Sequence, residues 1–520
     1  MPILTTAPEA MKTVISCMNL ITIFAKTYTS QRRTPLYLLL LIIVLPRMAQ
    51  AQTGANDAAT IAARIERVET GLLGPVAITG QAPTRMALSE RMRALNVPGV
   101  SIAIINDGKI EWARGYGVAD ASDKRPVSTD TLFQVASISK SVSAAAILRL
   151  VQQGKLGLDD DVNSRLLSWK LQGAPSAPAP VVTVRQLLSH TGGTTVSGFA
   201  GYTPTEPVPG LQAILNGEKP ANSPRIVVDT PPGQALRYSG GGYTVLQQMV
   251  MDVTGQPFDK LMQANVFDPL NMSHSTFAQP LPPRLQANAA SAHDKSGAVL
   301  PGKWNTYPTL AAAGLWSTPS DLARFALAIE QASDGKSATF LSKPMASAML
   351  TSVLNQYGLG MSLEGRGADA RFFHSGANAG IRSMMVGYVH KGQGAVILTN
   401  SDNGGGLIQE LLRAIAAEYK WNAYKPVERV LAPAEPALFA RYVGKFAVAG
   451  RTITVTTRDD KLFVQEDSFG TQPIALLPES ATRYFALEAN LTLTFVPQSD
   501  GAVDAVDVAY FGNYRATRIK

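Results

Sequence analysis

The chain has 520 residues, of which 46% are hydrophobic and 17% charged, a composition typical of a globular protein with two or three domains. Its formal net charge of +8 is uneven, because the first 51 residues hold five of the 47 basic side chains and one of the 39 acidic ones. The rest of the chain has 42 basic and 38 acidic side chains, a balance that gives no argument for nucleic-acid binding.

The first 51 residues are typical of an export signal. Arg32 and Arg33 precede a short apolar run at 36–45, and the Ala-Gln-Ala sequence at 49–51 fits a cleavage site. Cleavage there predicts a periplasmic or secreted protein that begins near Gln52 and has no stable membrane insertion. The alternative is an uncleaved protein that the same apolar run anchors in the membrane.

The only cysteine, Cys17, lies inside this signal. The mature chain would therefore have no disulfide, no thiolate metal site and no cysteine nucleophile. Three histidines, His274, His293 and His390, show no ligand spacing to one another. We expect neither a metal nor another cofactor.

The predicted elements alternate between helices and strands as far as residue 424. A helical pattern covers residues 52–95, and two β-rich runs at 100–105 and 109–116 flank a good hairpin turn, Asn-Asp-Gly at 106–108. Further helices are predicted at 141–153, 243–253, 258–266, 319–329 and 407–419, and further strands at 380–388 and 394–399. Strands at both ends with helices between them predict one α/β or α+β domain whose sheet combines distant segments.

The pattern changes after this region. Residues 425–436 contain three prolines and are typical of a linker. Residues 437–520 contain short strand-like runs separated by turns, which predict a small β-barrel or sandwich. The predicted organisation is a signal peptide at 1–51, the α/β (α+β) domain at 52–424, the linker, and a β domain at 437–520.

The most informative stretch is Ser137-Ile138-Ser139-Lys140, which begins where a strand-like segment gives way to a helix. Residues three apart on a helix share a face, so the amine of Lys140 would reach the hydroxyl of Ser137. A serine hydroxyl is a poor nucleophile until a neighbouring group takes its proton. The structural alternative is that Ser137 merely caps the helix.

Three more motifs accompany this pair. Residues 183–193 predict a helix that runs into a glycine turn, residues 231–243 place Tyr238 in a tight loop before a helix, and residues 372–380 let the backbone approach a ligand at Gly376. Together the motifs resemble the serine hydrolases related to class C β-lactamases and low-molecular-weight penicillin-binding proteins, over roughly residues 75–420. The resemblance implies a β-lactamase/transpeptidase-like domain with an antiparallel sheet and a helical subdomain.

The resemblance also implies roles for three side chains. Ser137 would be the acylated nucleophile, Lys140 its activating partner and Tyr238 the general base. His190, in the helix-turn motif, is expected to be a buried, hydrogen-bonded residue and not the base.

The remaining site residues follow from the same resemblance. His374, Ser375 and Gly376 resemble the family's Lys-Thr-Gly element on the edge strand of the sheet, with histidine first. Together with Ser239 they would bind substrate, and the backbone N–H groups of Ser137 and Ala377 would form the oxyanion hole. One departure is that the family's Tyr-x-Asn motif here ends in Gly240, which removes an amide side chain and favours small esters over β-lactams.

The C-terminal β domain resembles the lipocalin-like barrels appended to some of these hydrolases, and residues 442–446 suit the start of such a barrel. In relatives such a domain covers the cleft or helps to assemble oligomers, so a homo-oligomer is among the expected partners. We expect an exported serine hydrolase acting on a small-molecule or peptide substrate: a small ester, a D-amino-acid peptide or a β-lactam. The alternative is a non-catalytic protein of the same fold that binds cell-wall peptides, although such a protein would not need Ser137, Lys140 and Tyr238 together.

Overall fold

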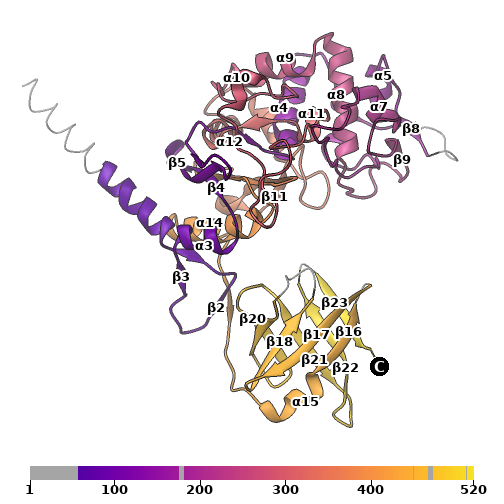
Figure 1. Cartoon of the computed structure of the whole chain (residues 1–520). Helices are drawn as coiled ribbons and strands as arrows, with labels where there is room; N and C mark the ends of the chain where they lie inside the picture. Colours follow the sequence, from indigo (N-terminus) through magenta and orange to yellow (C-terminus); the bar gives the residue numbers. More distant parts are fainter. Residues whose placement is uncertain (1–56, 175–180, 449, 467–471, 511, 520) are drawn as a thin grey trace, which may run out of the picture. The chain divides into compact units, whose positions relative to one another are not determined.

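The computed structural model describes residues 57–174, 181–448, 450–466, 472–510 and 512–519 (Figure 1). The predicted export signal and its cleavage site lie outside these residues. None of the helices in the described segments combines the length and the apolar character needed to cross a bilayer.

The N-terminal part of the described chain is only partly helical. Residues 57–69 form a helix, and α3 spans Leu88–Ala94. The prediction of a helical segment at 52–95 is wrong between these helices, where three short strands lie: β1 (Leu72–Leu73), β2 (Val76–Ile78) and β3 (Arg85–Met86). The reason is that glycine and proline interrupt the helical pattern, and that the backbone of β2 pairs with the distant strand β15 (Val427–Arg429).

A seven-stranded antiparallel sheet forms the centre of the larger domain, in the order β11-β12-β13-β14-β4-β5-β6. Its strands are β4 (Gly99–Asn106), β5 (Lys109–Asp120), β6 (Arg125–Pro126), β11 (Ser362–Glu364), β12 (Arg371–Asn378), β13 (Ile381–Tyr388) and β14 (Gly394–Thr399). The predicted hairpin is confirmed, because Asp107 and Gly108 both have positive φ between β4 and β5, as a type I′ turn requires. The α/β (α+β) class and the sheet built from distant segments are therefore confirmed.

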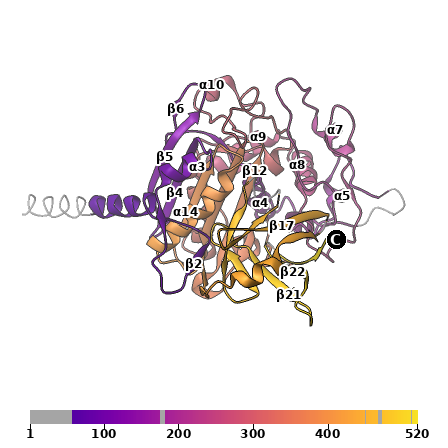
Figure 2. The same ribbon diagram turned by 60° about the horizontal axis from the view of Figure 1, so that its bottom comes forward.

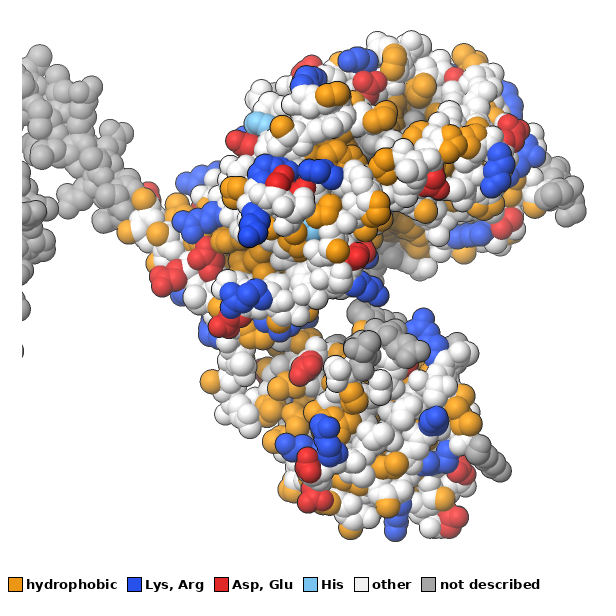
Figure 3. All heavy atoms as spheres, in the orientation of Figure 1, with side chains coloured by type: hydrophobic (Ala, Val, Ile, Leu, Met, Phe, Trp, Pro, Cys, Tyr) orange, Lys and Arg blue, Asp and Glu red, His pale blue; other side chains and the backbone are white. Residues whose placement is uncertain are grey.

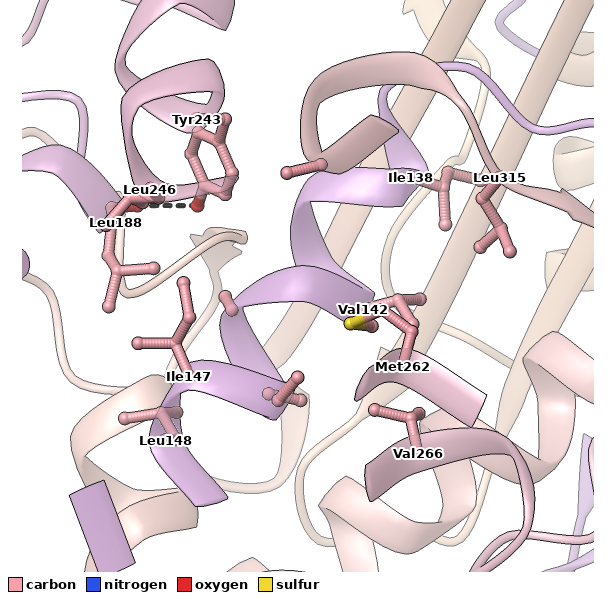
Figure 4. Close-up of a cluster of buried hydrophobic side chains, with 14 of the residues drawn as sticks. Ile138, Val142, Ile147, Leu148, Leu188, Tyr243, Leu246, Met262, Val266 and Leu315 are labelled. Carbon is pink, nitrogen blue, oxygen red and sulfur yellow. Dashed lines mark hydrogen bonds between the residues drawn. The ribbon is translucent and has the colours of Figure 1, made fainter. Parts of the chain in front are cut away.

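Helices cover both faces of this sheet. The helices α4 (Ile138–Gln152) and α12 (Pro319–Ser333) pack on one face, and α14 (Gly404–Glu418) packs on the other (Figure 1, Figure 2). Nearly every residue of α4 is buried, so neighbouring elements fix the helix from several sides. Figure 4 shows this core, to which Leu315, Met262 and Val266 contribute from outside α4.

The helix α8 (Gly240–Thr254), as long as α4, and a set of shorter helices complete the larger domain. The predicted helices near 243–253 and 258–266 are confirmed as α8 and as α9 (Phe258–Met262), which continues into a π-helical turn at Gln263–Phe267. The others are α5 (Val162–Arg165), α6 (Val184–Leu188), α7 (Leu211–Asn216), α10 (Pro283–Gln286), α11 (Leu310–Ala313) and α13 (Lys343–Met349).

The C-terminal domain is a closed eight-stranded barrel, so the barrel and not the sandwich is confirmed. Its strands are β16 (Gly444–Val448), β17 (Arg451–Arg458), β18 (Lys461–Gln465), β19 (Ile474–Pro478), β20 (Arg483–Ala486), β21 (Thr492–Pro497), β22 (Val503–Ala509) and β23 (Asn513–Arg518). Side chains fill the core of this domain, including a stack of Tyr442 on Phe495 with ring centroids 4.2 Å apart. On the molecular face drawn in Figure 3, basic and acidic side chains are interspersed, in keeping with the nearly balanced charge of the chain after residue 51.

Candidate active site

The site begins at the strained turn that leads into α4. The short strand β7 (Phe133–Gln134) precedes Ala136, whose φ of 48° lies in the left-handed region that costs energy for a residue other than glycine. Ser137 follows at the N-cap position, but its hydroxyl makes no capping hydrogen bond. The capping alternative for Ser137 therefore does not hold, and the hydroxyl remains available for chemistry.

Lys140 lies directly beside this hydroxyl. Its side chain is buried, and its Nζ lies 3.0 Å from the Oγ of Ser137 and donates a hydrogen bond to the carbonyl oxygen of Ala312 at 2.7 Å. The i, i+3 geometry of the helix produces the first contact, as predicted. The second contact was missed because a backbone carbonyl in α11 leaves no side-chain signal in the sequence.

Tyr238 also lies close to the lysine. It is half-buried in the loop before α8, and the Nζ of Lys140 lies 4.9 Å from the centroid of its ring. The structure thus brings together the three side chains that the sequence implied to be catalytic.

Ser239, the next residue, is fully buried, and its hydroxyl forms hydrogen bonds to the backbone of the protein. Its Oγ accepts a hydrogen bond from the backbone N–H of Gly242 at 2.9 Å and donates one to the carbonyl oxygen of Thr195 at 2.8 Å. These bonds make Ser239 the N-cap of α8, and they leave its hydroxyl occupied.

The His374-Ser375-Gly376 segment lies on β12 where this strand forms the edge of the sheet. The pairing of β11 with β12 ends at Phe373, so the following residues pair with β13 alone. A Cβ atom at Gly376 would lie 2.3 Å from the carbonyl oxygen of Val135 and 2.3 Å from the Oγ of Ser383. Only a glycine therefore lets this strand come so close to the segment that precedes Ser137.

The exposed residues of this edge alternate with the buried ones. Ser375 and Ala377 are exposed, whereas His374 is buried. The Nδ1 of His374 donates to the carbonyl oxygen of Ser375 at 2.6 Å, and its Nε2 has no hydrogen-bond partner among the described residues. Burial and the nearby Lys140 lower the pKa of His374 to about 3, so this ring is uncharged at neutral pH, unlike the lysine in the family's usual triplet.

His190 packs against Tyr238, and two further buried aromatic rings, Tyr243 and Tyr357, pack against His190; these two tyrosines had no sequence signal beyond their place in a helix or loop. His190 is buried, as expected, and its ring centroid lies 4.3 Å from that of Tyr238, 5.3 Å from that of Tyr243 and 4.9 Å from that of Tyr357. Among the described residues, no group of three or more histidine, cysteine or acidic side chains could hold a metal ion.

Comparison with known proteins identifies the family. The Beta-lactamase family model matches residues 85–420, which is more than half of the chain. The chain belongs to the Beta-lactamase family. The match covers the Ser137, Tyr238 and Gly376 motifs together, so the resemblance seen in the sequence is confirmed.

Three relatives and structural neighbours are similar to this chain along most of their own length. A penicillin-binding protein of Bacillus subtilis (strain 168) is 26% identical over 429 residues, which cover 76% of this chain and 89% of that protein. The octameric penicillin-binding protein homologue from Pyrococcus abyssi has the same fold, with a TM-score of 0.57 and 22% identity over 83% of this chain and 98% of its own. EstCE1, described as a hydrolase with promiscuous acyltransferase activity, matches with a TM-score of 0.53 and 21% identity over 69% of this chain and 99% of its own.

Proposed function

We propose that this member of the Beta-lactamase family is a serine hydrolase that cleaves an ester or amide through an acyl-enzyme on Ser137. The observation that supports this most strongly is the 3.0 Å contact between the buried Lys140 amine and a Ser137 hydroxyl that caps no helix. Tyr238 takes the proton of the hydroxyl as Oγ attacks the substrate carbonyl, and Lys140 stabilises the resulting charge. The leaving group departs with the proton that Tyr238 took from Ser137. Tyr238 then takes a proton from water as the water attacks the acyl-enzyme, and returns it to the Oγ of Ser137.

The oxyanion hole in this proposal consists of the backbone N–H groups of Ser137 and Ala377. Two observations support it: the close approach that Gly376 permits between β12 and the segment before Ser137, and the exposure of Ala377 on the unpaired edge. Backbone donors held by a sheet edge and a helix start need no reorganisation as the oxyanion forms.

A small ester is the substrate that these surroundings favour. Gly240 offers no amide to a substrate, the Ser239 hydroxyl is occupied as a cap, and His374 is neutral, so fewer groups are left to hold the amide and carboxylate of a peptide or β-lactam. The fold shared with EstCE1, described as a hydrolase with promiscuous acyltransferase activity, agrees with hydrolysis through an acyl group. The alternative is a non-catalytic cell-wall-peptide-binding protein, which the similarity to penicillin-binding proteins supports.

Intact-protein mass spectrometry after treatment with a fluorophosphonate tests the proposal. Ser333, at the end of α12, is also followed three residues later by a lysine, Lys336, and serves as the control. We expect one adduct in the unaltered protein and in Ser333→Ala, and none in Ser137→Ala. Labelling that persists in Ser137→Ala overturns the proposal. The same samples are then assayed with short-chain p-nitrophenyl esters, D-alanyl peptides and cephalosporins, and binding of cell-wall peptides without any adduct or turnover would favour the alternative.

We also propose that the protein is exported and that residues 52–424 and 437–520 form separate domains joined by residues 425–436, a connection whose strand β15 pairs with β2 of the larger domain. N-terminal sequencing of the protein isolated from cells should find a start near Gln52, whereas a retained apolar run would favour the membrane anchor. The octameric neighbour makes a homo-oligomer a reasonable proposal for this chain, and light scattering of the full-length protein measures it directly.

A further inference from the structure

His190 holds the backbone on both sides of Tyr238. The N–H of Arg237 donates to the carbonyl oxygen of His190 at 2.8 Å, and the N–H of Ser239 donates to the Nδ1 of its imidazole at 3.1 Å. One residue, remote by nearly fifty positions, therefore fixes the peptide group that follows the proposed base and the peptide group on the N-terminal side of Arg237.

The local conformation of His190 allows it to make both bonds. The helix α6 ends at Leu188, and His190 has a φ of 58°, in the left-handed region that histidine and asparagine adopt more readily than most residues. Its carbonyl and its side chain can then both accept bonds from the Tyr238 loop. The ring is buried against the phenol, so it restricts the side chain of Tyr238 as well as the backbone.

The hydrogen bonds also define the state of the imidazole. Because Nδ1 accepts an N–H, the ring proton of the neutral form resides on Nε2, which has no hydrogen-bond partner among the described residues. Burial, together with the nearby Lys140 and His374, lowers the pKa of His190 well below its ordinary value. An acceptor at Nδ1 is therefore present throughout the neutral pH range.

We infer that His190 is a positioning residue for Tyr238: it holds the phenol beside Lys140 through the acceptor at Nδ1 and takes no proton from the substrate or from Ser137. This inference rests on the proposed hydrolase function. A misplacement of about 1 Å of a reacting group can cost about 10²-fold in rate, so loss of the Nδ1 acceptor should lower kcat more than it changes KM.

Two variants with amide side chains separate the contribution of the hydrogen-bond acceptor from that of the imidazole ring. In His190→Asn, the Oδ1 atom takes the place of Nδ1, and asparagine tolerates the left-handed conformation. In His190→Gln, the amide oxygen lies one bond further out, near the position of Nε2. We expect kcat of the asparagine variant to stay close to that of the unaltered protein and kcat of the glutamine variant to fall about 10²-fold, with similar KM values.

Thermal unfolding of each variant shows whether it is folded. If His190→Gln does not fold, His190→Gly replaces it, since glycine adopts the left-handed conformation without strain and lacks both the side-chain acceptor and the ring that packs against Tyr238. The second readout combines His190→Gln, or His190→Gly in its place, with Tyr238→Phe. We expect almost no further loss of kcat relative to Tyr238→Phe alone, because the hydroxyl that His190 positions is already absent.

Three results would overturn the inference: equal kcat values for the asparagine and glutamine variants, a folded but inactive asparagine variant, or losses that multiply fully with Tyr238→Phe. Fluorophosphonate labelling of Ser137 in the unaltered protein keeps the two proposals apart. Absent labelling is a failure of the proposed hydrolase, whereas normal labelling together with any of these three results is a failure of the His190 inference alone.

Discussion

Ser137 and Ser333 are each followed three residues later by a lysine, yet their surroundings have little in common. The first pair lies where α4 begins, with Lys140 buried and its Nζ 3.0 Å from the serine Oγ. The second pair lies where α12 ends, and Gly335 turns the chain with a φ of 74° before Lys336. The side chain of Lys336 is 70% exposed, and its Nζ lies 2.8 Å from Asp334, not from the serine.

The difference lies in what surrounds the lysine. A helix that starts at the serine fixes the i, i+3 contact, whereas a helix that ends there releases it. The burial of Lys140 next to a carbonyl and two tyrosine rings removes water from the amine, so its interaction with Ser137 is stronger than it would be at the surface. The exposed pair of Lys336 and Asp334 contributes little by comparison.

The largest expected effect is a loss of kcat that distinguishes Lys140 from Lys336. Lys140→Met should lower kcat by about 10²- to 10⁴-fold on p-nitrophenyl esters, because it removes the group that activates Ser137. The matched variant Lys336→Met should leave kcat unchanged, since its partner is Asp334. Steady-state kinetics of the two variants at one pH measures this, and equal losses in both would refute the distinction between the two copies.

The phenol beside Lys140 gives the next test. Tyr238→Phe should lower kcat by about 10²-fold with little change in melting temperature, because it removes a proton-transfer group from a half-buried side chain. The control is Tyr243→Phe, which removes a buried hydrogen bond to the carbonyl oxygen of Leu188 and should cost about 1 kcal/mol of stability. A reversal, with Tyr243→Phe inactive and Tyr238→Phe nearly normal, would mean that the base is assigned to the wrong tyrosine.

The sequence predicted the residues around the Ser137 hydroxyl because each of them belongs to a local motif. Helix periodicity placed Lys140 on the face of Ser137, and the glycine-rich turns located Tyr238 and Gly376. It could not predict the carbonyl of Ala312 or the two hydrogen bonds from the Tyr238 loop to His190, because these are tertiary contacts made by backbone groups. The short strands at 72–86 were missed for a related reason, since strands of two or three residues that are stabilised by pairing, β1 with β3 and β2 with the distant β15, have no local period of their own.

A third prediction concerns Glu330, which lies on α12 one turn before Ser333. Its carboxylate is buried without a hydrogen-bond partner among the described residues, and a Cβ at Gly387 would lie 2.9 Å from its Oε1. Burial, reinforced by the negative charge of Asp334, raises the pKa of Glu330 well above its ordinary value. The folded protein therefore holds a proton that the unfolded chain releases.

The sign of the effect follows from this difference in bound protons. The contribution of Glu330 to stability is complete below the carboxyl pKa of the unfolded chain, about 4.3, and is lost as pH rises towards the raised pKa of the folded state. At pH 8 Glu330→Gln should exceed the unaltered protein in unfolding free energy by about 1–3 kcal/mol, and at pH 4 the gap should close. Urea unfolding at both pH values measures it, with Glu90→Gln, at an exposed position of α3, as the control. A gap that does not change with pH would contradict the prediction.

The smallest expected effect concerns Gly240, the departure from the family motif that lies two residues after Tyr238. A Cβ at Gly240 would lie 3.1 Å from the Cε2 of Phe199 and 3.2 Å from the carbonyl oxygen of Ser197, so an asparagine fits only if the half-buried Phe199 ring moves. We expect Gly240→Asn alone to change little, and Gly240→Asn with Phe199→Ala to raise the ratio of cephalosporin to ester turnover by about tenfold, the value of one restored hydrogen bond. Phe199→Ala alone is the control for the space that the ring leaves. If the unaltered protein already hydrolyses cephalosporins efficiently and ignores esters, then Gly240 does not limit its substrate range. In that case the neutral His374 and the Ser239 hydroxyl that caps α8 do not exclude β-lactams either.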